Sequence, residues 1–215
     1  VPEKWGEKRM KPIKGLMISA AFAAAAFTAS GAAFAQATPG FTAATSRVNW
    51  EKPIEPFRII DNVYYVGTAG LASYLFVTPE GSILLDGAMP ETAPVIEANI
   101  KKLGFKLTDV KYLLNSHAHA DHSGGLAKLK ADTGAKMLAS EGDRPALEGG
   151  YNSGSPDTTP TTPAVKVDTV VNDGYKLTLG GRTLTAHLTP GHTRGCTSWG
   201  FEAKDGGKTY QGLVF

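Results

Sequence analysis

The chain has 215 residues, of which 42% are hydrophobic and 20% are charged, and it contains one Cys. These values fit one soluble globular domain with an ordinary core. The formal net charge of +2 arises in the first 35 residues, which hold five basic and two acidic side chains, whereas the rest of the chain carries 17 basic and 18 acidic ones. No run of Lys and Arg remains there, so we expect no nucleic-acid partner.

The N-terminus has the composition of a secretory leader. Residues 1–9 precede the first methionine and are expected to be translated upstream sequence. From Met10 the chain runs through two lysines and an apolar stretch to an A-x-A cleavage signal that ends at Ala35. This order predicts a signal peptide over residues 10–35, and hence a periplasmic or secreted protein with no membrane attachment after cleavage. A transmembrane anchor is the alternative, although the Ala and Gly content makes the stretch only weakly hydrophobic.

After an irregular N-terminal arm over residues 36–47, one domain is expected over residues 48–215. Runs rich in β-branched and aromatic residues predict that it opens with an antiparallel sheet. Helical spacing of apolar residues then begins to alternate with short apolar runs, which is typical of an α/β fold. The predicted strands of this half are 58–67, 72–78, 83–86, 110–115 and 136–140, and the predicted helices are 91–103, 125–133 and 143–147.

The second half of the domain is predicted to be mainly β. Residues 149–163 contain Ser, Thr, Pro and Gly with almost no large apolar side chain, so they form a loop, and long loops often border active sites. Short strands separated by glycine turns follow, and the chain ends in a predicted hairpin about Asp205-Gly-Gly207. These strands are 166–171, 175–179, 183–188, 197–202 and 208–215.

The segment that carries chemistry is His117-Ala-His-Ala-Asp-His122, directly after the predicted strand 110–115. In an extended segment His117 and His119 point the same way, so both imidazoles can reach one ion. Asp121 and His122 can face a neighbouring position. Nitrogen and oxygen ligands of this kind suit Zn²⁺, so the segment predicts a site for one or two metals. The alternatives are a polar loop with incidental histidines or a single structural metal clip.

Four further residues require interpretation. His192, at the tip of a Pro-Gly-His-Thr loop after a strand, is placed to complete a three-imidazole site, whereas His187 lies inside the strand and is expected to pack or to support a ligand. Asp86 ends a buried strand; it is either a turn or cap residue or a carboxylate that accepts the free ring N–H of a zinc-bound His. Cys196 implies a reactive thiol, an intermolecular bridge or an absent partner, and the strand-like run that stops at Phe215 favours an absent partner.

The motif H-x-H-x-D-H with a later loop His resembles the metallo-β-lactamase family. The flanking segments resemble more closely the class B metallo-β-lactamases of the third subclass, over about residues 48 to 215. The resemblance implies an αββα sandwich whose C-terminal part lies beyond this chain. The segments are Pro53-Ile-Glu-Pro-Phe-Arg58, Asn62-Val-Tyr-Tyr-Val-Gly67, Gly70-Leu-Ala-Ser-Tyr74, Ile83-Leu-Leu-Asp-Gly87, Leu114-Asn-Ser-His117, Ser123-Gly-Gly-Leu126 and Thr189-Pro-Gly-His-Thr-Arg-Gly-Cys196.

The resemblance also implies which residues hold the metal. It places His117, His119 and His192 on a first zinc, and Asp121 and His122 on a second. A further His, which completes the second zinc in that subclass, is expected beyond this chain together with a Cys that would bridge to Cys196. The chain therefore holds five of six ligands, and we expect it to hold the second zinc weakly.

The activity implied is opening of the β-lactam ring of antibiotics by a zinc-bound hydroxide that Asp121 holds and orients, in a monomer that needs no serine nucleophile. Lactonases share the zinc motif and are the main enzymatic alternative. A non-catalytic periplasmic zinc-binding protein is the alternative from another class. The leader and the nearly neutral surface argue against nucleases and cytosolic thioester hydrolases.

Overall fold

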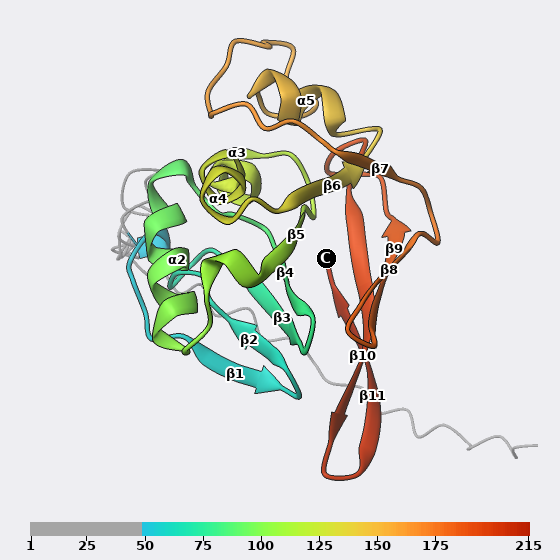
Figure 1. The fold of residues 1–215 in the computed structure, drawn as a ribbon. Coiled ribbons are helices and arrows are strands. Elements are labelled where there is room, and N and C mark those ends of the chain that lie inside the picture. Colours follow the sequence, from blue (N-terminus) through green and yellow to red (C-terminus); the bar gives the residue numbers. More distant parts are fainter. Residues whose placement is uncertain (1–48) are drawn as a thin grey trace, which may run out of the picture. The chain divides into compact units, whose positions relative to one another are not determined.

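The computed structural model describes residues 49–215, so the predictions for the leader and for the arm that ends at residue 47 lie outside the described residues. The described strands form two sheets (Figure 1). One has seven strands in the order β1-β2-β3-β4-β5-β6-β7, and the other has four in the order β11-β10-β9-β8. Within residues 49–215, no helix is both long and apolar enough to cross a membrane.

The first four strands pair antiparallel, as the sequence predicts. The single strand predicted over residues 58–67 is wrong, because the chain turns at Asp61 and forms two strands. Asp61 has a φ of 50°, a left-handed conformation that Asp tolerates better than most residues. The strands are β1 (Phe57–Ile60), β2 (Val63–Tyr65), β3 (Tyr74–Thr78) and β4 (Gly81–Leu85).

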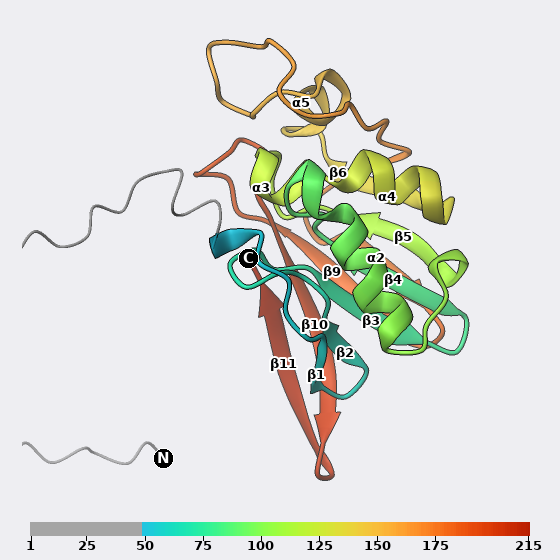
Figure 2. The same cartoon turned by 90° about the vertical axis from the view of Figure 1, so that its left-hand side faces the viewer.

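The remaining strands of this sheet run parallel to β4 and are linked by helical crossovers. Helices α2 and α4 lie side by side over one face of the sheet (Figures 1 and 2). Their apolar sides join a buried cluster with that face, which includes Ile96, Leu113 and Leu129. The strands are β5 (Val110–Leu114), β6 (Lys136–Ser140) and β7 (Thr169–Val171). The helices are η1 (Pro90–Thr92), α2 (Ala93–Lys102), η2 (Leu107–Asp109), α3 (Ala120–Ser123), α4 (Leu126–Thr133) and α5 (Arg144–Gly149).

The four-stranded sheet is an antiparallel meander, and its inner face packs against the seven-stranded sheet. Trp199 is fully buried there, and the ring of Phe201 lies 5.0 Å from that of Phe76. The layers of helices, sheet and sheet confirm the predicted α/β fold of the metallo-β-lactamase type. The strands are β8 (Lys176–Leu179), β9 (Arg182–Leu188), β10 (Thr197–Asp205) and β11 (Lys208–Val214).

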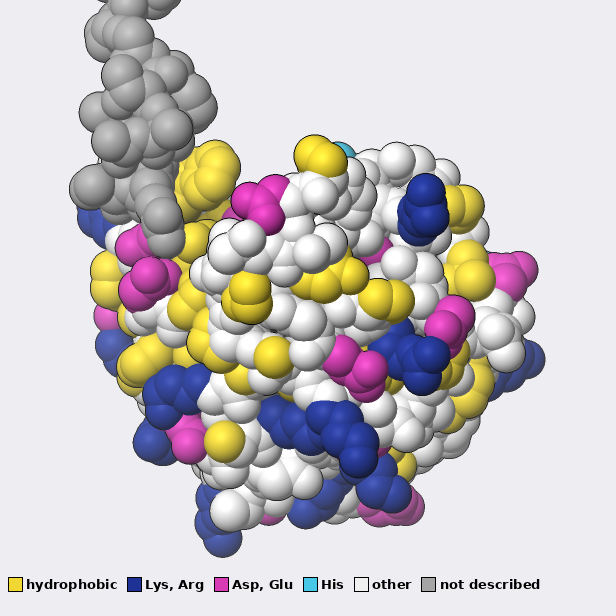
Figure 3. Space-filling view, turned by 90° about the horizontal axis from the view of Figure 1, so that it is seen from above, with side chains coloured by type: hydrophobic (Ala, Val, Ile, Leu, Met, Phe, Trp, Pro, Cys, Tyr) yellow, Lys and Arg dark blue, Asp and Glu magenta, His cyan; other side chains and the backbone are white. Residues whose placement is uncertain are grey.

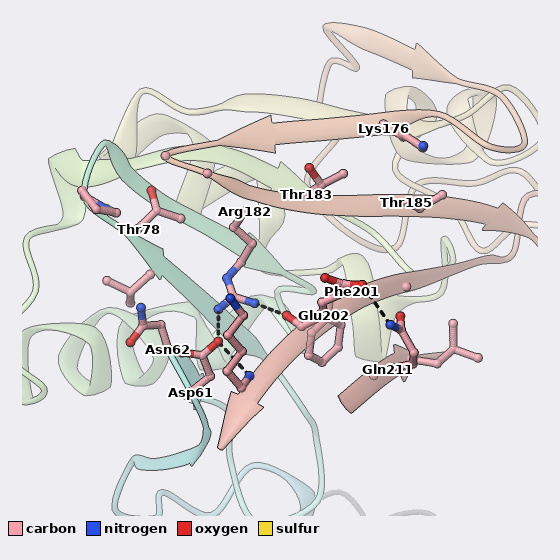
Figure 4. Close-up of a pocket in the computed structure, with 18 of the residues that line it drawn as sticks. Asp61, Asn62, Thr78, Lys176, Arg182, Thr183, Thr185, Phe201, Glu202 and Gln211 are labelled. Atoms are coloured by element: carbon pink, nitrogen blue, oxygen red, sulfur yellow. Dashed lines mark hydrogen bonds and ion pairs between the residues drawn. The ribbon is translucent and has the colours of Figure 1, made fainter. Parts of the chain in front are cut away.

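The outer face of this second sheet is polar and bears a hollow of about 790 Å³ (Figure 4). At its edge, the Arg182 guanidinium donates to the Asp61 carboxylate and to the backbone carbonyl of Glu202, each at 2.7 Å. His187 lines the same hollow and is exposed. The prediction that His187 packs is wrong, because the alternation along β9 turns Ala186 into the core and His187 away from it.

Candidate metal centre

The two predicted ligand loops meet because the two sheets are joined where β5 and β9 end. The backbone N–H of Thr197 donates to the carbonyl of Ser116 at 2.8 Å, and the Trp199 indole donates to the carbonyl of Asn115 at 3.1 Å. These bonds fix the start of β10 against the residues that precede His117. The loop that carries His192 is thereby held beside the loop that carries the other histidines.

Three of the predicted ligands converge. The ring centroid of His117 lies 5.0 Å from that of His119 and 4.8 Å from that of His192, and Nδ1 of His119 lies 3.0 Å from Nε2 of His192. Each residue offers a ligand atom within 4.8 Å of those of the other two. A second such group consists of His117, Asp121 and His122. The five predicted ligands therefore form one continuous cluster with His117 in the middle.

The cluster is partly sheltered from solvent. His117, His119, Asp121 and His122 have intermediate exposure, while His192 is exposed. Only a small patch of histidine surface is visible when the molecule is seen from above (Figure 3).

Asp86 lies behind this cluster, and its carboxylate is directed at the metal loop. The residue is 3% exposed. One oxygen accepts from the backbone N–H of Ser116 at 2.7 Å and from the side chain of Asn115 at 3.2 Å, while the other lies 2.6 Å from Ser116 Oγ and 3.0 Å from His122 Nδ1. These are the contacts expected of a carboxylate that orients a histidine ligand.

The pKa values of His117 and His122 are shifted in opposite directions. Burial, together with the nearby His122, lowers the pKa of His117 to about 4, so its imidazole is neutral at pH 7 and keeps a free nitrogen lone pair. Burial also acts to lower the pKa of His122, but the hydrogen bond and charge of Asp86 and the charge of Asp121 outweigh it, and the pKa is raised. With its Nδ1 proton held by Asp86, His122 presents Nε2 towards the Asp121 carboxylate, which is 3.7 Å away.

The long loop after α5 also touches the cluster, through two residues that the sequence did not single out. The Ser153 carbonyl lies 3.0 Å from His119 Nε2, so Nδ1 of His119 is the nitrogen that faces His192. The Ser153 N–H donates to the Ala118 carbonyl, and the Asn152 side chain accepts from the N–H of Ala120. Backbone bonds of this kind carry no sequence signature; the only signal was that a long loop often borders a site.

The donor set fits zinc. Three imidazole nitrogens suit a tetrahedral zinc site that keeps one open position, and a carboxylate beside an imidazole suits a second ion. Once His117, His119 and His192 serve one ion, Asp121 and His122 are left for another within residues 49–215. The remaining histidine, His187, lies on the outer face of the second sheet and belongs to neither group.

The class of protein follows from a family comparison. A model described as the metallo-beta-lactamase superfamily matches residues 67–205, and the chain belongs to this superfamily. The predicted family is thereby confirmed.

Solved structures point to a subclass. The chain is 51% identical to BJP-1, a subclass B3 metallo-beta-lactamase of Bradyrhizobium japonicum, with a TM-score of 0.75 over 79% of this chain and 65% of that one. It is 43% identical to the metallo-beta-lactamase GOB-18 from Elizabethkingia meningoseptica, with a TM-score of 0.75 over 78% of this chain and 63% of that one. The predicted resemblance to the third subclass is confirmed, although the chain spans less than two thirds of either enzyme.

Curated relatives carry a different name. A hydroxyacylglutathione hydrolase from Methylococcus capsulatus is 33% identical over 109 residues, which are 51% of this chain and 34% of that protein. One from Rhodospirillum rubrum is 30% identical over 112 residues, 52% of this chain and 36% of that protein. These relatives make thioester hydrolases a second candidate class, because the predicted leader, which disfavours a cytosolic enzyme, lies outside the described residues.

Proposed function

We propose that this protein is a zinc-dependent hydrolase that opens the β-lactam ring of antibiotics. The observation that carries the proposal is the convergence of His117, His119 and His192 beside Asp121 and His122, in a chain 51% identical to a subclass B3 metallo-beta-lactamase. The proposed substrate is a small molecule, in keeping with a cluster that is partly exposed at a loop edge of the sandwich. Periplasmic or secreted location and a monomeric state belong to the same proposal.

In the proposed site, His117, His119 and His192 hold one zinc, and Asp121 and His122 contribute to a second. Zinc bound there would supply a nucleophile at neutral pH, because it lowers the pKa of water to about 7, and would polarise the substrate carbonyl.

The protein's own groups position the reactants. Asp86 keeps a proton on Nδ1 of His122, and the Ser153 carbonyl does the same for Nε2 of His119, so each ring turns one defined nitrogen to the cluster. The Asp121 carboxylate accepts a hydrogen bond from the attacking water and orients it. We therefore assign Asp121 as the catalytic residue. Pre-set geometry of this kind lowers the entropy cost of reaching the transition state.

Hydrolysis of glutathione thioesters is the second candidate function, because the curated relatives are named hydroxyacylglutathione hydrolases. Attack on a thioester carbonyl would use the same cluster, so the cluster alone does not discriminate. Substrate identity is set by the walls around the metal, and the likeness to the solved B3 enzymes covers more of this chain and is higher in identity. Lactone hydrolysis and zinc binding without catalysis are the other outcomes to be tested.

The test is a substrate panel with zinc-loaded protein: nitrocefin, a carbapenem, a hydroxyacyl thioester of glutathione and a simple lactone. We expect β-lactam turnover that a chelator abolishes and added zinc restores. A His192→Ala variant serves as the control for contaminating hydrolases, since it removes a residue of the proposed first site. Turnover of the thioester or lactone with no β-lactam turnover would replace the proposed substrate class.

A further inference from the structure

Asp143 is a buried carboxylate whose position is explained neither by the helix it precedes nor by an ion pair. It is 1% exposed and occupies the position before α5, yet its side chain forms no capping bond to that helix. Within residues 49–215, no cationic side chain pairs with it. Burying a carboxylate is costly unless other groups bind it. Its partners therefore indicate what it does.

Those partners come from the two ligand loops. One carboxylate oxygen accepts from the backbone N–H of Ala118 and from the hydroxyl of Thr193, each at 2.9 Å. The other accepts from the backbone N–H of Gly195 at 3.1 Å. Ala118 separates His117 from His119, and Thr193 follows His192. A single oxygen atom thus bridges the backbone of the first loop to the residue beside the third histidine.

The turn that carries Asp143 interlocks with the His192 loop. A Cβ on Gly195 would lie 2.3 Å from the backbone nitrogen of Asp143, and one on Gly142 would lie 2.6 Å from the carbonyl of Arg194. The hydroxyl of Ser140 donates to the Gly195 carbonyl at 2.6 Å. With backbone packed against backbone, this loop has little freedom to shift, and the Asp143 carboxylate also bonds it to the loop that carries His117 and His119.

We propose that Asp143 is a positioning residue for the first metal site, and that its carboxylate sets the spacing between His192 and the His117–His119 pair. The proposal rests on the metal centre of the proposed function and not on its substrate. Ligands that are held in place before binding lose less entropy when the ion arrives, so the tether raises zinc affinity. The Asp143 carboxylate bonds to both ligand loops, so its loss should loosen both of them.

The test uses three single variants of the full chain and one double variant. Asp143→Asn keeps the size of the side chain but turns an amide towards donors, and Thr193→Val removes one arm of the bridge. Asp168→Asn is the matched control, since Asp168 also accepts a backbone N–H, from Met137 at 2.7 Å, but pairs with Lys130 and touches neither ligand loop. Zinc affinity is measured by competition with a chromophoric chelator, and site geometry by the visible spectrum of the cobalt-substituted protein.

We expect Asp143→Asn to weaken the tighter zinc site by about 10- to 100-fold and Thr193→Val by a smaller factor, with altered cobalt spectra in both. Their double variant should weaken it by less than the product of the two factors, because both act on one bridge. Asp168→Asn should leave affinity and spectrum unchanged. In metal-free protein, the Ala118 and Gly195 amides should exchange faster in Asp143→Asn, a readout that needs neither zinc nor activity.

Wild-type affinity and an unchanged cobalt spectrum in Asp143→Asn would overturn the proposal, even if its melting temperature fell. If that variant did not fold, unchanged affinity in Thr193→Val would overturn it equally. A wild-type protein that binds zinc without opening β-lactams would contradict the proposed function and leave this inference standing.

Discussion

The Asp86 carboxylate lies 3.0 Å from Nδ1 of His122 and receives two further bonds from Ser116, so one buried acid holds both a proposed ligand and the start of the ligand loop. Asp86 has a φ of 65°, a left-handed conformation that Asp and Asn adopt more readily than other non-glycine residues. Both the backbone conformation of Asp86 and its side-chain contacts with Ser116 and His122 therefore favour aspartate at this position.

Replacing Asp86 should therefore weaken metal binding in a graded way. Asp86→Ala should lower zinc affinity by about 10- to 100-fold, because His122 loses its orienting partner, and Asp86→Asn should cost less because Asn keeps an acceptor and suits the backbone. Isothermal titration with zinc measures both. Equal affinity in Asp86→Ala and the wild type would show that His122 is held without Asp86.

His187 and His192 lie near the end of β9, and only His192 belongs to the cluster, so their alanine variants can be compared directly. His192→Ala should remove high-affinity zinc binding and all hydrolysis, because it deletes one of three converging imidazoles. His187→Ala should change neither, because His187 is exposed on the opposite face of the sheet. Zinc content after dialysis, read by atomic absorption, distinguishes them. Loss of zinc from the His187 variant would contradict the assignment of the cluster.

The five side chains that the sequence singled out lie together in the structure, because the chemistry of a metal site restricts residue type and spacing. His117, His119, Asp121 and His122 stand in one short run, and the Pro-Gly-His context marked His192. Asp143, Asn152 and Ser153 were missed, since a buried carboxylate or a backbone carbonyl can bind many partners and no local pattern predicts which. The turn at Asp61 was missed for a related reason: the strands on both sides have high β-propensity, and only the sheet geometry decides where the chain turns back.

Trp199 should contribute to the stability of the fold at the point where the second sheet contacts the metal loop. It is fully buried, and its indole N–H donates to the Asn115 carbonyl, two residues before His117. Trp199→Phe loses that bond and leaves a small void, so the free energy of unfolding should fall by about 2–4 kcal/mol. Urea unfolding of metal-free protein measures the loss. A change below about 0.5 kcal/mol would show that the junction between the sheets does not depend on this residue.

The ion pair between Asp61 and Arg182 should make stability depend on pH. Burial acts to raise the pKa of Asp61, but the hydrogen bonds from Arg182 and the backbone of Lys204 outweigh it, so the pKa is lowered. A lowered pKa contributes stability that is present above the unfolded-state value near 4 and is lost as the pH falls through the folded-state value. Asp61→Asn should therefore destabilise the protein by about 1 kcal/mol at pH 7, because both groups are partly open to water, and by progressively less below pH 4. A difference that stays constant from pH 7 to pH 3 would refute the assignment.

The decisive measurement is β-lactam hydrolysis by the complete gene product, including any residues encoded beyond Phe215. The purified protein is loaded with zinc and offered nitrocefin and a carbapenem, with a glutathione thioester and a lactone in parallel. We expect opening of the β-lactam ring that stops on chelation and returns with zinc. Zinc-loaded protein that leaves both β-lactams intact while it cleaves the thioester or the lactone would contradict it.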